Sequence, residues 1–254
     1  MTYNVCSLAN AFLTHCPKKE ELAAGHQQNA DTGLQMTADE YALLADVNTR
    51  SAVVECFIWR SIVSGIFGGS HQKSQAGARG GGGFAGIRFH AITCERPAKV
   101  SQSTAADFFH WRAQGAVLIE TTMGLQDQLL RKHAAREQLR LSVLLPLDKR
   151  KDRSARDALH QDLLSVFRDA LWLFSTFMKS RALFDVHWAS QSEFSKESVA
   201  YDPVVMEEEV RGSGPDDGRR VVFNVSPGLR KIDTADGTDY DRTMILVKPR
   251  VVCN

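Results

Sequence analysis

The chain has 254 residues, of which 43% are hydrophobic, and its 31 basic and 30 acidic side chains give a formal net charge of +1. This length fits one large domain or two small ones with a substantial hydrophobic core. A net charge so close to zero produces no bulk attraction to nucleic acid or to an anionic membrane, so any such partner would need a local basic patch.

The five cysteines are scattered and include no C-x-x-C pair: Cys6, Cys16, Cys56, Cys94 and Cys253. This pattern is typical of reduced thiols and disfavours a disulfide framework or a zinc ribbon. The N-terminus lacks the basic region of a secretory signal, and no run reaches the roughly 18 apolar residues of a membrane-spanning helix. The sequence therefore predicts a cytoplasmic or nuclear protein that is neither secreted nor embedded in a membrane.

The first clear element is a long helix that begins at Thr37. Thr37 and Glu40 have the spacing of a capping box, in which the hydroxyl accepts a hydrogen bond from a backbone N–H and the carboxylate reaches back. Apolar residues then recur at helical spacing until about residue 66: Leu44, Val47, Val54, Ile58 and Ile62. Gly68 and Gly69 should end this helix, because glycine loses more backbone entropy in a helix than other residues do.

The segment at residues 68–86 is polar and rich in glycine, a composition typical of a mobile loop. Within it, residues 81–86 match the dinucleotide-binding pattern G-x-G-x-x-G. That pattern requires a preceding strand and a following helix in a βαβ unit, whereas a helix and a polar loop precede it here. We therefore expect residues 70–83 to be mobile and to bind no cofactor.

Two further helices are predicted in the middle of the chain. Thr104 and Asp107 form a second capping-box pattern. The helix that starts there has four large apolar residues: Phe108, Trp111, Leu118 and Ile119. Another helical stretch covers residues 125–145 and ends at Pro146, which lacks a backbone donor. A charged linker at 148–153 follows.

The most apolar helix is predicted directly after this linker. Its apolar residues keep a period of 3.6: Leu159, Leu163, Val166, Phe167, Ala170, Phe174, Phe177 and Met178. The stripe is widened by Leu164, Leu171, Trp172 and Leu173. Such a helix needs neighbours on several sides, so we expect Leu163, Phe167, Ala170 and Phe174 to lie in the centre of the fold.

After Trp188 the chain becomes polar, and the hydrophobic period then changes from 3.6 to 2. Residues 221–225 form one short β-branched stretch, and residues 244–247 with 251–253 form the other, which together predict a β-hairpin. Its buried face would be formed by Val221, Phe223 and Val225 with Ile245, Val247 and Val251 from the facing strand. Two strands alone are marginally stable, so the hairpin should dock on the helices.

The predicted fold class is therefore mainly α, an irregular helical bundle with a short C-terminal β-hairpin. Residues 1–190 would form the helical domain, and residues 191–254 would form a polar linker and the hairpin packed on that domain.

Four pieces of the chain resemble a group of uncharacterised proteins from filamentous fungi, and their order is similar. These pieces are DEYALL at 39–44, FIWR at 57–60, FHWRAQ at 109–114 and VSPGLRK at 225–231. The resemblance extends loosely over most of the chain and implies a fungal source. Because no activity is established for that group, it implies no catalytic residue.

Asp185 and His187 form the closest pair of a carboxylate and an imidazole. Alternate residues share a side in an extended stretch, so these two could share a metal ion or a proton, although a hydrogen-bonded surface pair is the commoner outcome. His110 and Glu120 are the other polar groups considered for a site assembled from distant residues. The aspartates at 233–241 miss the spacing of a calcium loop and predict a solvated turn, so no metal is expected.

The densest basic cluster consists of Lys149, Arg150, Lys151 and Arg153. It could serve nuclear import or contact phosphate, but three interspersed aspartates favour a solvated linker between helices. Together with Arg131, Lys132, Arg136 and Arg140, it could also form a basic strip over residues 131–156 that binds nucleic acid.

No nucleophile motif and no phosphate-binding loop occurs in the sequence. The leading hypothesis is therefore a non-enzymatic intracellular interaction or regulatory protein with a protein partner and no cofactor. The alternatives are an enzyme whose site is assembled from distant residues and a nucleic-acid-binding protein that uses the 131–156 region.

Overall fold

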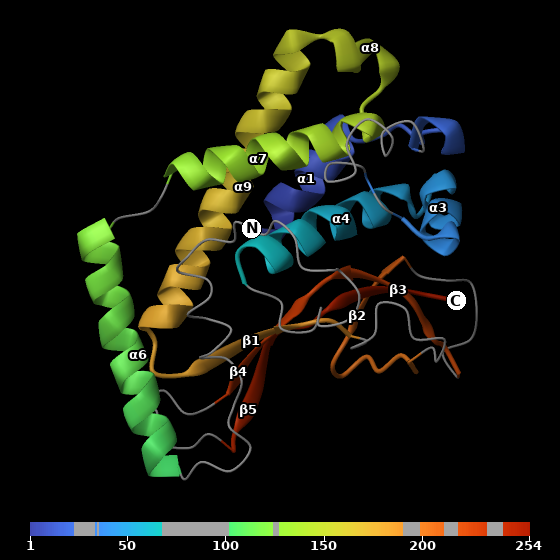
Figure 1. Cartoon of the computed structure of the whole chain (residues 1–254). Helices are drawn as coiled ribbons and strands as arrows, with labels where there is room; N and C mark the ends of the chain where they lie inside the picture. The colour runs from blue at the N-terminus through green and yellow to red at the C-terminus, as the bar shows by residue number, and fades with distance from the viewer. Residues whose placement is uncertain are drawn as a thin grey trace. The chain divides into compact units, whose positions relative to one another are not determined.

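The computed structural model describes residues 1–22, 34, 36–67, 102–123, 127–189, 199–210, 218–232 and 241–254 (Figure 1). These residues are mainly helical and include two three-stranded sheets, in agreement with the predicted mainly α class. None of the helices in this part of the chain is long and apolar enough to cross a membrane.

The chain divides into two compact units that each combine two separate stretches. Unit 1 contains Met1–Ser61 and Asp127–Ala170, and unit 2 contains Ile62–Gln126 and Leu171–Asn254. Residues on both sides of position 190 therefore belong to unit 2. The division of the chain into domains at 1–190 and 191–254 stays a prediction.

Unit 1 is helical. Its elements are α1 (Thr2–Phe12), α3 (Ala38–Ala45), most of α4 (Arg50–Gly65), α7 (Asp127–Leu141), the short 3-10 helix η1 (Ser142–Leu144), α8 (Leu147–Lys151) and the first part of α9 (Arg153–Lys179). Apolar side chains from α1, α3, α4, α7, η1 and α9 are buried, among them Leu8, Leu44, Phe57, Leu130, Leu144 and Phe167.

The helix predicted from Thr37 to about residue 66 is in fact two helices, α3 and α4. The predicted capping box is present: the Thr37 hydroxyl accepts from the Glu40 N–H at 3.2 Å, and the Glu40 carboxylate accepts from the Thr37 N–H at 2.7 Å. The break lies at residues 46–49, where the Asp46 carboxylate accepts from the Asn48 N–H at 3.0 Å. Short polar side chains of this kind compete with the helical hydrogen bonds and favour a turn.

Arg50 stabilises the end of α3. Its guanidinium donates to the carbonyls of Leu44 at 3.0 Å, Ala45 at 3.2 Å and Thr14 at 3.1 Å. The first two of these carbonyls belong to the last turn of a helix, where intrahelical donors are missing. Val47 lies in the turn and is 75% exposed, so its predicted place on the buried face of a continuous helix is wrong.

The charged linker predicted at 148–153 is largely helical, because α8 covers Leu147–Lys151 and α9 begins at Arg153. Pro146 is the N-cap of α8, a place where its missing N–H costs nothing. The predicted apolar helix is confirmed as α9, and Leu163, Phe167, Ala170 and Phe174 are all buried. Trp172 is 61% exposed, so it does not belong to the buried stripe.

Unit 2 combines α6 (Gln102–Met123) and the end of α9 with the six strands. One sheet has the order β1 (Leu183–His187), β4 (Gly228–Ile232), β5 (Thr243–Val247), and the other has the order β2 (Glu207–Val210), β6 (Arg250–Cys253), β3 (Val221–Ser226). Figure 1 labels most of these strands.

The strand arrangement is larger than the predicted hairpin. β3 pairs antiparallel with β6, and β4 pairs antiparallel with β5, while β1 joins β4 and β2 joins β6 in parallel. Pro227 separates β3 from β4, and Pro249 lies between β5 and β6, because proline cannot donate to a ladder. Val221, Phe223 and Val225 are buried as predicted, but Ile245 and Val247 lie opposite β4 and not opposite β3.

Gly228 lies at this break and has no room for a side chain. A Cβ at this position would be 2.6 Å from Pro249 Cδ, 2.8 Å from the Pro249 backbone nitrogen and 2.9 Å from His187 Cε1. Gly228→Ala should therefore lower the free energy of unfolding by ~1–3 kcal/mol in urea titrations, as overpacking does. In Gly115→Ala, the control, the Cβ meets nothing within 4 Å, and the gain in helix propensity should raise stability by ~0.5–1 kcal/mol. Equal stability of Gly228→Ala and the parent protein would contradict this account.

Phe167 is fully buried in α9 and contacts the His133 ring edge-to-face at a centroid distance of 4.6 Å. Phe167→Ala should cost ~3–5 kcal/mol of unfolding free energy, because it removes a large buried ring and leaves a cavity. Trp172→Ala on the same helix removes an exposed ring and should cost well under ~1 kcal/mol. If chemical denaturation shows equal losses for the two variants, the burial of this stripe is not what stabilises α9.

Candidate interaction surface

The apolar strand β5 is the last strand in the order of its sheet (Figure 1). All five of its residues are exposed. Met244 is 58% exposed, Ile245 37%, Leu246 44% and Val247 48%. Within the described residues, the second edge of β5 pairs with no strand. An edge strand presents unpaired backbone donors and acceptors, so β5 is a candidate site for the addition of another strand.

The sequence of β5 lacks two of the features that usually prevent edge pairing, charge and proline, and its ladder with β4 has one register shift, between Ile245 and Val247. Its five residues, Thr243–Val247, include no charge and no proline. Basic residues occur only beside its ends, at Arg242 and Lys248. The Lys248 ammonium donates to the Pro203 carbonyl at 2.6 Å, which attaches the end of β5 to the rest of unit 2.

The other two strands of the sheet hold β5 in a fixed frame. Asp185 on β1 lies directly opposite Arg230 on β4, and its carboxylate accepts from Arg230 Nε at 3.0 Å and from a second guanidinium nitrogen. Phe184 of β1 stacks on Phe177 of α9, with centroids 4.4 Å apart and planes inclined by 9°. Strand β1 is therefore fixed both to β4 and to a helix.

Arg112 attaches α6 to the same frame. Its side chain is among the largest fully buried ones, and its guanidinium donates to the carbonyls of Ser180 at 2.8 Å and Ala182 at 2.9 Å, where α9 gives way to β1. The guanidinium also lies over the Phe109 ring, 4.6 Å from its centroid. Phe109 and Leu183 form a buried cluster, so α6 and β1 share a small core.

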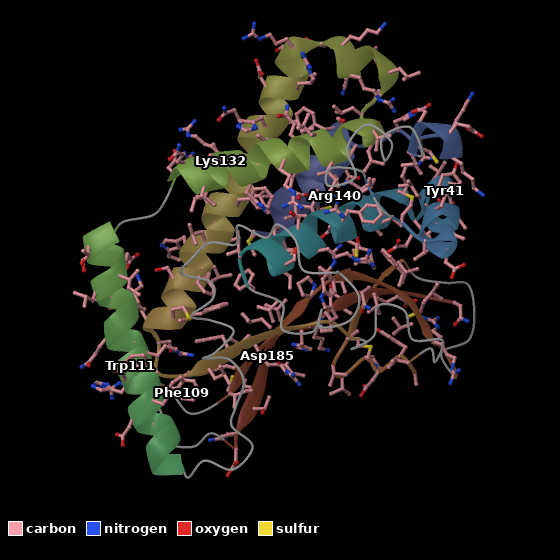
Figure 2. The ribbon with its side chains drawn as sticks, in the orientation of Figure 1. Tyr41, Phe109, Trp111, Lys132, Arg140 and Asp185 are labelled. Atoms are coloured by element: carbon pink, nitrogen blue, oxygen red, sulfur yellow. The ribbon has the colours of Figure 1, made fainter. Side chains whose placement is uncertain are left out.

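The opposite face of α6 is apolar and exposed. Trp111 is 53% exposed, Leu118 67% and Ile119 43%, and the Trp111 ring packs on Phe108 at a centroid distance of 6.1 Å. Figure 2 labels the buried Phe109 and the exposed Trp111 on the same helix. Residues that the sequence pattern marks as candidates for a core are thus on the surface.

The four residues considered for an enzymatic site all lie in unit 2, and three of them, Glu120, His110 and Asp185, contact different partners. Glu120 accepts from Lys179 at 2.8 Å, and this hydrogen bond lowers the pKa of its carboxyl group. His110 bonds to Gln114 at 3.0 Å, and Asp185 is paired with Arg230. Both carboxylates are thus held by basic side chains, which favours structural roles for them.

His187 lies on the same side of β1 as Asp185, two residues away, as the strand period requires. Its Nδ1 atom is buried and has no hydrogen-bond partner among the described residues. Burial lowers the pKa of His187, and the nearby Arg230 lowers it further, while Asp185 acts in the opposite direction.

One residue of the basic linker, Arg150, is held by contacts inside unit 1. Arg150 donates to the carbonyls of Leu145 at 2.9 Å and Val143 at 2.6 Å and forms an ion pair with Glu21 at 3.0 Å. This ion pair lowers the pKa of Glu21 through its hydrogen bond. Arg150 therefore joins the N-terminal segment to the chain after α7.

The remaining members of the linker are more exposed. Lys149 Nζ donates weakly to the Ala11 carbonyl at 3.4 Å, and Arg153 forms an exposed ion pair with Asp157 at 3.7 Å. Lys151 is exposed. Exposed pairs of this kind contribute little to stability. These contacts therefore do not prevent the residues from binding phosphate.

Acidic residues interrupt the proposed basic strip on α7. Asp127 accepts from Arg131 at 2.7 Å and from Arg168 at 2.6 Å, and these hydrogen bonds lower the pKa of its carboxyl group. Arg140 pairs with the buried Glu137 at 3.2 Å. Lys132 and Arg136 are exposed, and Figure 2 labels Lys132 and Arg140 on α7.

Within the described ranges, no group of three or more His, Cys, Asp or Glu residues could hold a metal ion. No disulfide joins the cysteines of the described part of the chain, which are Cys6, Cys16, Cys56 and Cys253. The loop at 70–83 and its glycine motif, and the aspartates at 233–240, lie outside the described residues.

Comparisons of the chain with protein-family models, with curated proteins and with solved structures gave no match. The resemblance to fungal proteins therefore stays a prediction. The sequence predicted a strand at 244–247 but placed Ile245 and Val247 on a buried face, whereas both are exposed. A continuous apolar run normally indicates a buried strand.

His187 should make the protein less stable in acid. Its pKa in the folded state lies below the ordinary value of 6.5, so the unfolded state binds more protons once the pH falls through that value. We expect full stability above about pH 6.5 and a progressive loss below it. Urea unfolding at several pH values should show a smaller acid loss for His187→Gln than for the parent protein.

The part of the acid loss that remains in His187→Gln has a second source. Burial also lowers the pKa of His133, which is in unit 1. An identical pH dependence for the parent protein and for His187→Gln would show that His187 titrates normally.

Proposed function

We propose that this protein is a non-enzymatic interaction protein that binds an extended segment of a partner protein by strand addition to β5. The observation that supports this proposal is the exposure of four consecutive large apolar residues on an edge strand, Met244–Val247. Soluble proteins normally protect such an edge with charges, prolines or a covering element, because it templates pairing with another chain.

A sheet edge selects an extended partner. The backbone N–H and C=O groups on the edge of β5 that pairs with no described strand can be satisfied by the ladder of another strand, whereas a helix already uses its own backbone groups. At ~3.3 Å per residue, the five residues of β5 offer an edge of about 17 Å. This length suits a partner segment of about five residues.

The side chains of β5 determine the kind of strand that pairs best. Successive residues point to opposite faces, so Thr243 and Ile245 share one face and Met244 lies on the other. The register with β4 shifts between Ile245 and Val247, and Val247, opposite Leu229, therefore lies on the face opposite to Ile245. Cross-strand apolar and β-branched pairs contribute roughly 0.2–1 kcal/mol each. A partner segment rich in valine, isoleucine or aromatic residues on both faces therefore fits β5 best.

Neither alternative function has comparable support. Asp185, Glu120 and His110 are engaged by Arg230, Lys179 and Gln114, and the α7 strip contains paired carboxylates.

A library of displayed random twelve-residue peptides, selected on the intact protein, would test strand addition without a known partner. Enriched peptides should carry apolar β-formers, and Leu246→Lys should weaken their binding about tenfold or more, because a charge on an edge strand opposes pairing. Leu246 is exposed, so this variant should remain folded, which circular dichroism would verify.

Val222→Lys is the matched control, because Val222 is an exposed apolar residue of similar exposure, 51%, on a strand of the other sheet. Peptides should bind this variant as tightly as the parent protein. If the selected peptides bind the parent, Leu246→Lys and Val222→Lys equally well, they bind away from β5, and the proposal is overturned.

A further inference from the structure

The exposed face of α6 is a second apolar surface, separate from the edge of β5. Six residues share one face of the 22-residue helix, and we call them the α6 stripe: Phe108, Trp111, Gly115, Leu118, Ile119 and Thr122. Phe108 is half-buried, because it also packs against the buried pair of Phe109 and Leu183. Their spacings of three, four and seven residues place them side by side on the helix. The stripe contains no charged side chain, so nothing in it opposes contact with an equally apolar surface.

The packing of the described residues does not explain Gly115 in the middle of the stripe. A Cβ at this position would meet none of them within 4 Å. Glycine inside a helix costs ~1 kcal/mol relative to alanine. A glycine on an exposed apolar face does allow the backbone of another helix to approach closely, since no side chain separates the two.

The stripe is complementary to itself. Trp111 lies four residues before Gly115 and Ile119 lies four residues after it. If a second copy of α6 crosses antiparallel at Gly115, Trp111 of each copy meets Ile119 of the other, and two contacts form about one twofold axis. The large side chains then lie on both sides of the point where the two backbones approach.

The exposed area limits the strength of this contact. A tryptophan side chain buries ~150–250 Å² when it is fully covered. With Trp111, Leu118 and Ile119 about half exposed, these three side chains offer about 300 Å² per copy, and the flanking residues of α6 bring the contact to on the order of 500 Å². Two copies then bury about 1,000 Å², which is the lower limit for a specific interface.

From the apolar stripe, its central glycine and its self-complementary order, we propose that the α6 stripe is the interface of a weak symmetric homodimer. The two copies cross antiparallel at Gly115. This inference does not depend on strand addition at β5, because no residue of the stripe belongs to that strand.

Sedimentation equilibrium of the full chain over a range of concentrations, with Gly115→Leu and Gly115→Ala as variants, tests the proposal. Gly115→Leu enlarges the apolar surface but separates the two backbones, so it should weaken dimerisation about tenfold or more. General hydrophobic association would be strengthened by the same change. Gly115→Ala adds one methyl group and should weaken dimerisation less than Gly115→Leu does.

Two more variants keep the test independent of any single substitution. Leu118→Lys puts a charge into the stripe of both copies and should abolish the dimer, while Trp172→Lys changes an exposed tryptophan on α9 and should leave it intact. Leu246→Lys on β5 should also leave it intact.

A full chain that stays monomeric at millimolar concentration would overturn the proposal. The proposal is also overturned if Gly115→Leu dimerises at least as tightly as the parent protein, or if Trp172→Lys no longer forms the dimer. Because peptide binding to β5 is measured separately, failure of either proposal leaves the other one standing.

Discussion

The contacts of the buried Arg112 guanidinium fix α6, and the exposed α6 stripe depends on them. A buried charge is costly unless it is compensated, and here the carbonyls of Ser180 and Ala182 accept from one guanidinium nitrogen while the guanidinium lies over the Phe109 ring. These contacts join α6 to the connection between α9 and β1. The orientation of α6, which buries Phe109 and exposes Trp111, therefore follows from where this one cation is held.

The exposure of β5 follows from a second constraint, the two prolines that interrupt the strands. Pro227 lies between β3 and β4, and Pro249 lies between β5 and β6, so the antiparallel pairing of these two stretches is interrupted and falls into two sheets. At the interruption, Gly228 has no side chain and allows Pro249 to lie close to its backbone. In the second sheet, β6 is central and has neighbours on both sides. In the first sheet β4 takes the central place, so the apolar strand β5 remains at the edge.

Local signals in the sequence predicted the elements that depend on neighbours in the sequence. The Thr37–Glu40 capping box, the stripe of α9 and the alternation at 221–225 each appear in the structure. The turn at Asp46 was missed because the hydrophobic period continued through it. Strands β1 and β2 are held by partners about 40 residues away in the chain, at Arg230 and Arg250, and short-range patterns contain no information about such pairing.

The candidate surfaces could not be predicted for a related reason. Periodicity shows that Trp111 and Leu118 lie on one face of a helix, but it does not show whether another segment covers that face. The same limit applies to Met244–Val247, whose composition is that of a buried strand.

The two proposed contacts would reinforce each other. A dimer formed through α6 carries two β5 edges, so a partner with two suitable segments would bind the second edge intramolecularly, provided that the chain between the segments can span the two edges. Only the dimer can bind a partner through both β5 edges at once. Because such a partner binds the dimer more tightly than the monomer, it also lowers the dissociation constant of the dimer. An interface as small as the α6 stripe could then be populated at low protein concentration when the partner is present and be largely dissociated when it is absent.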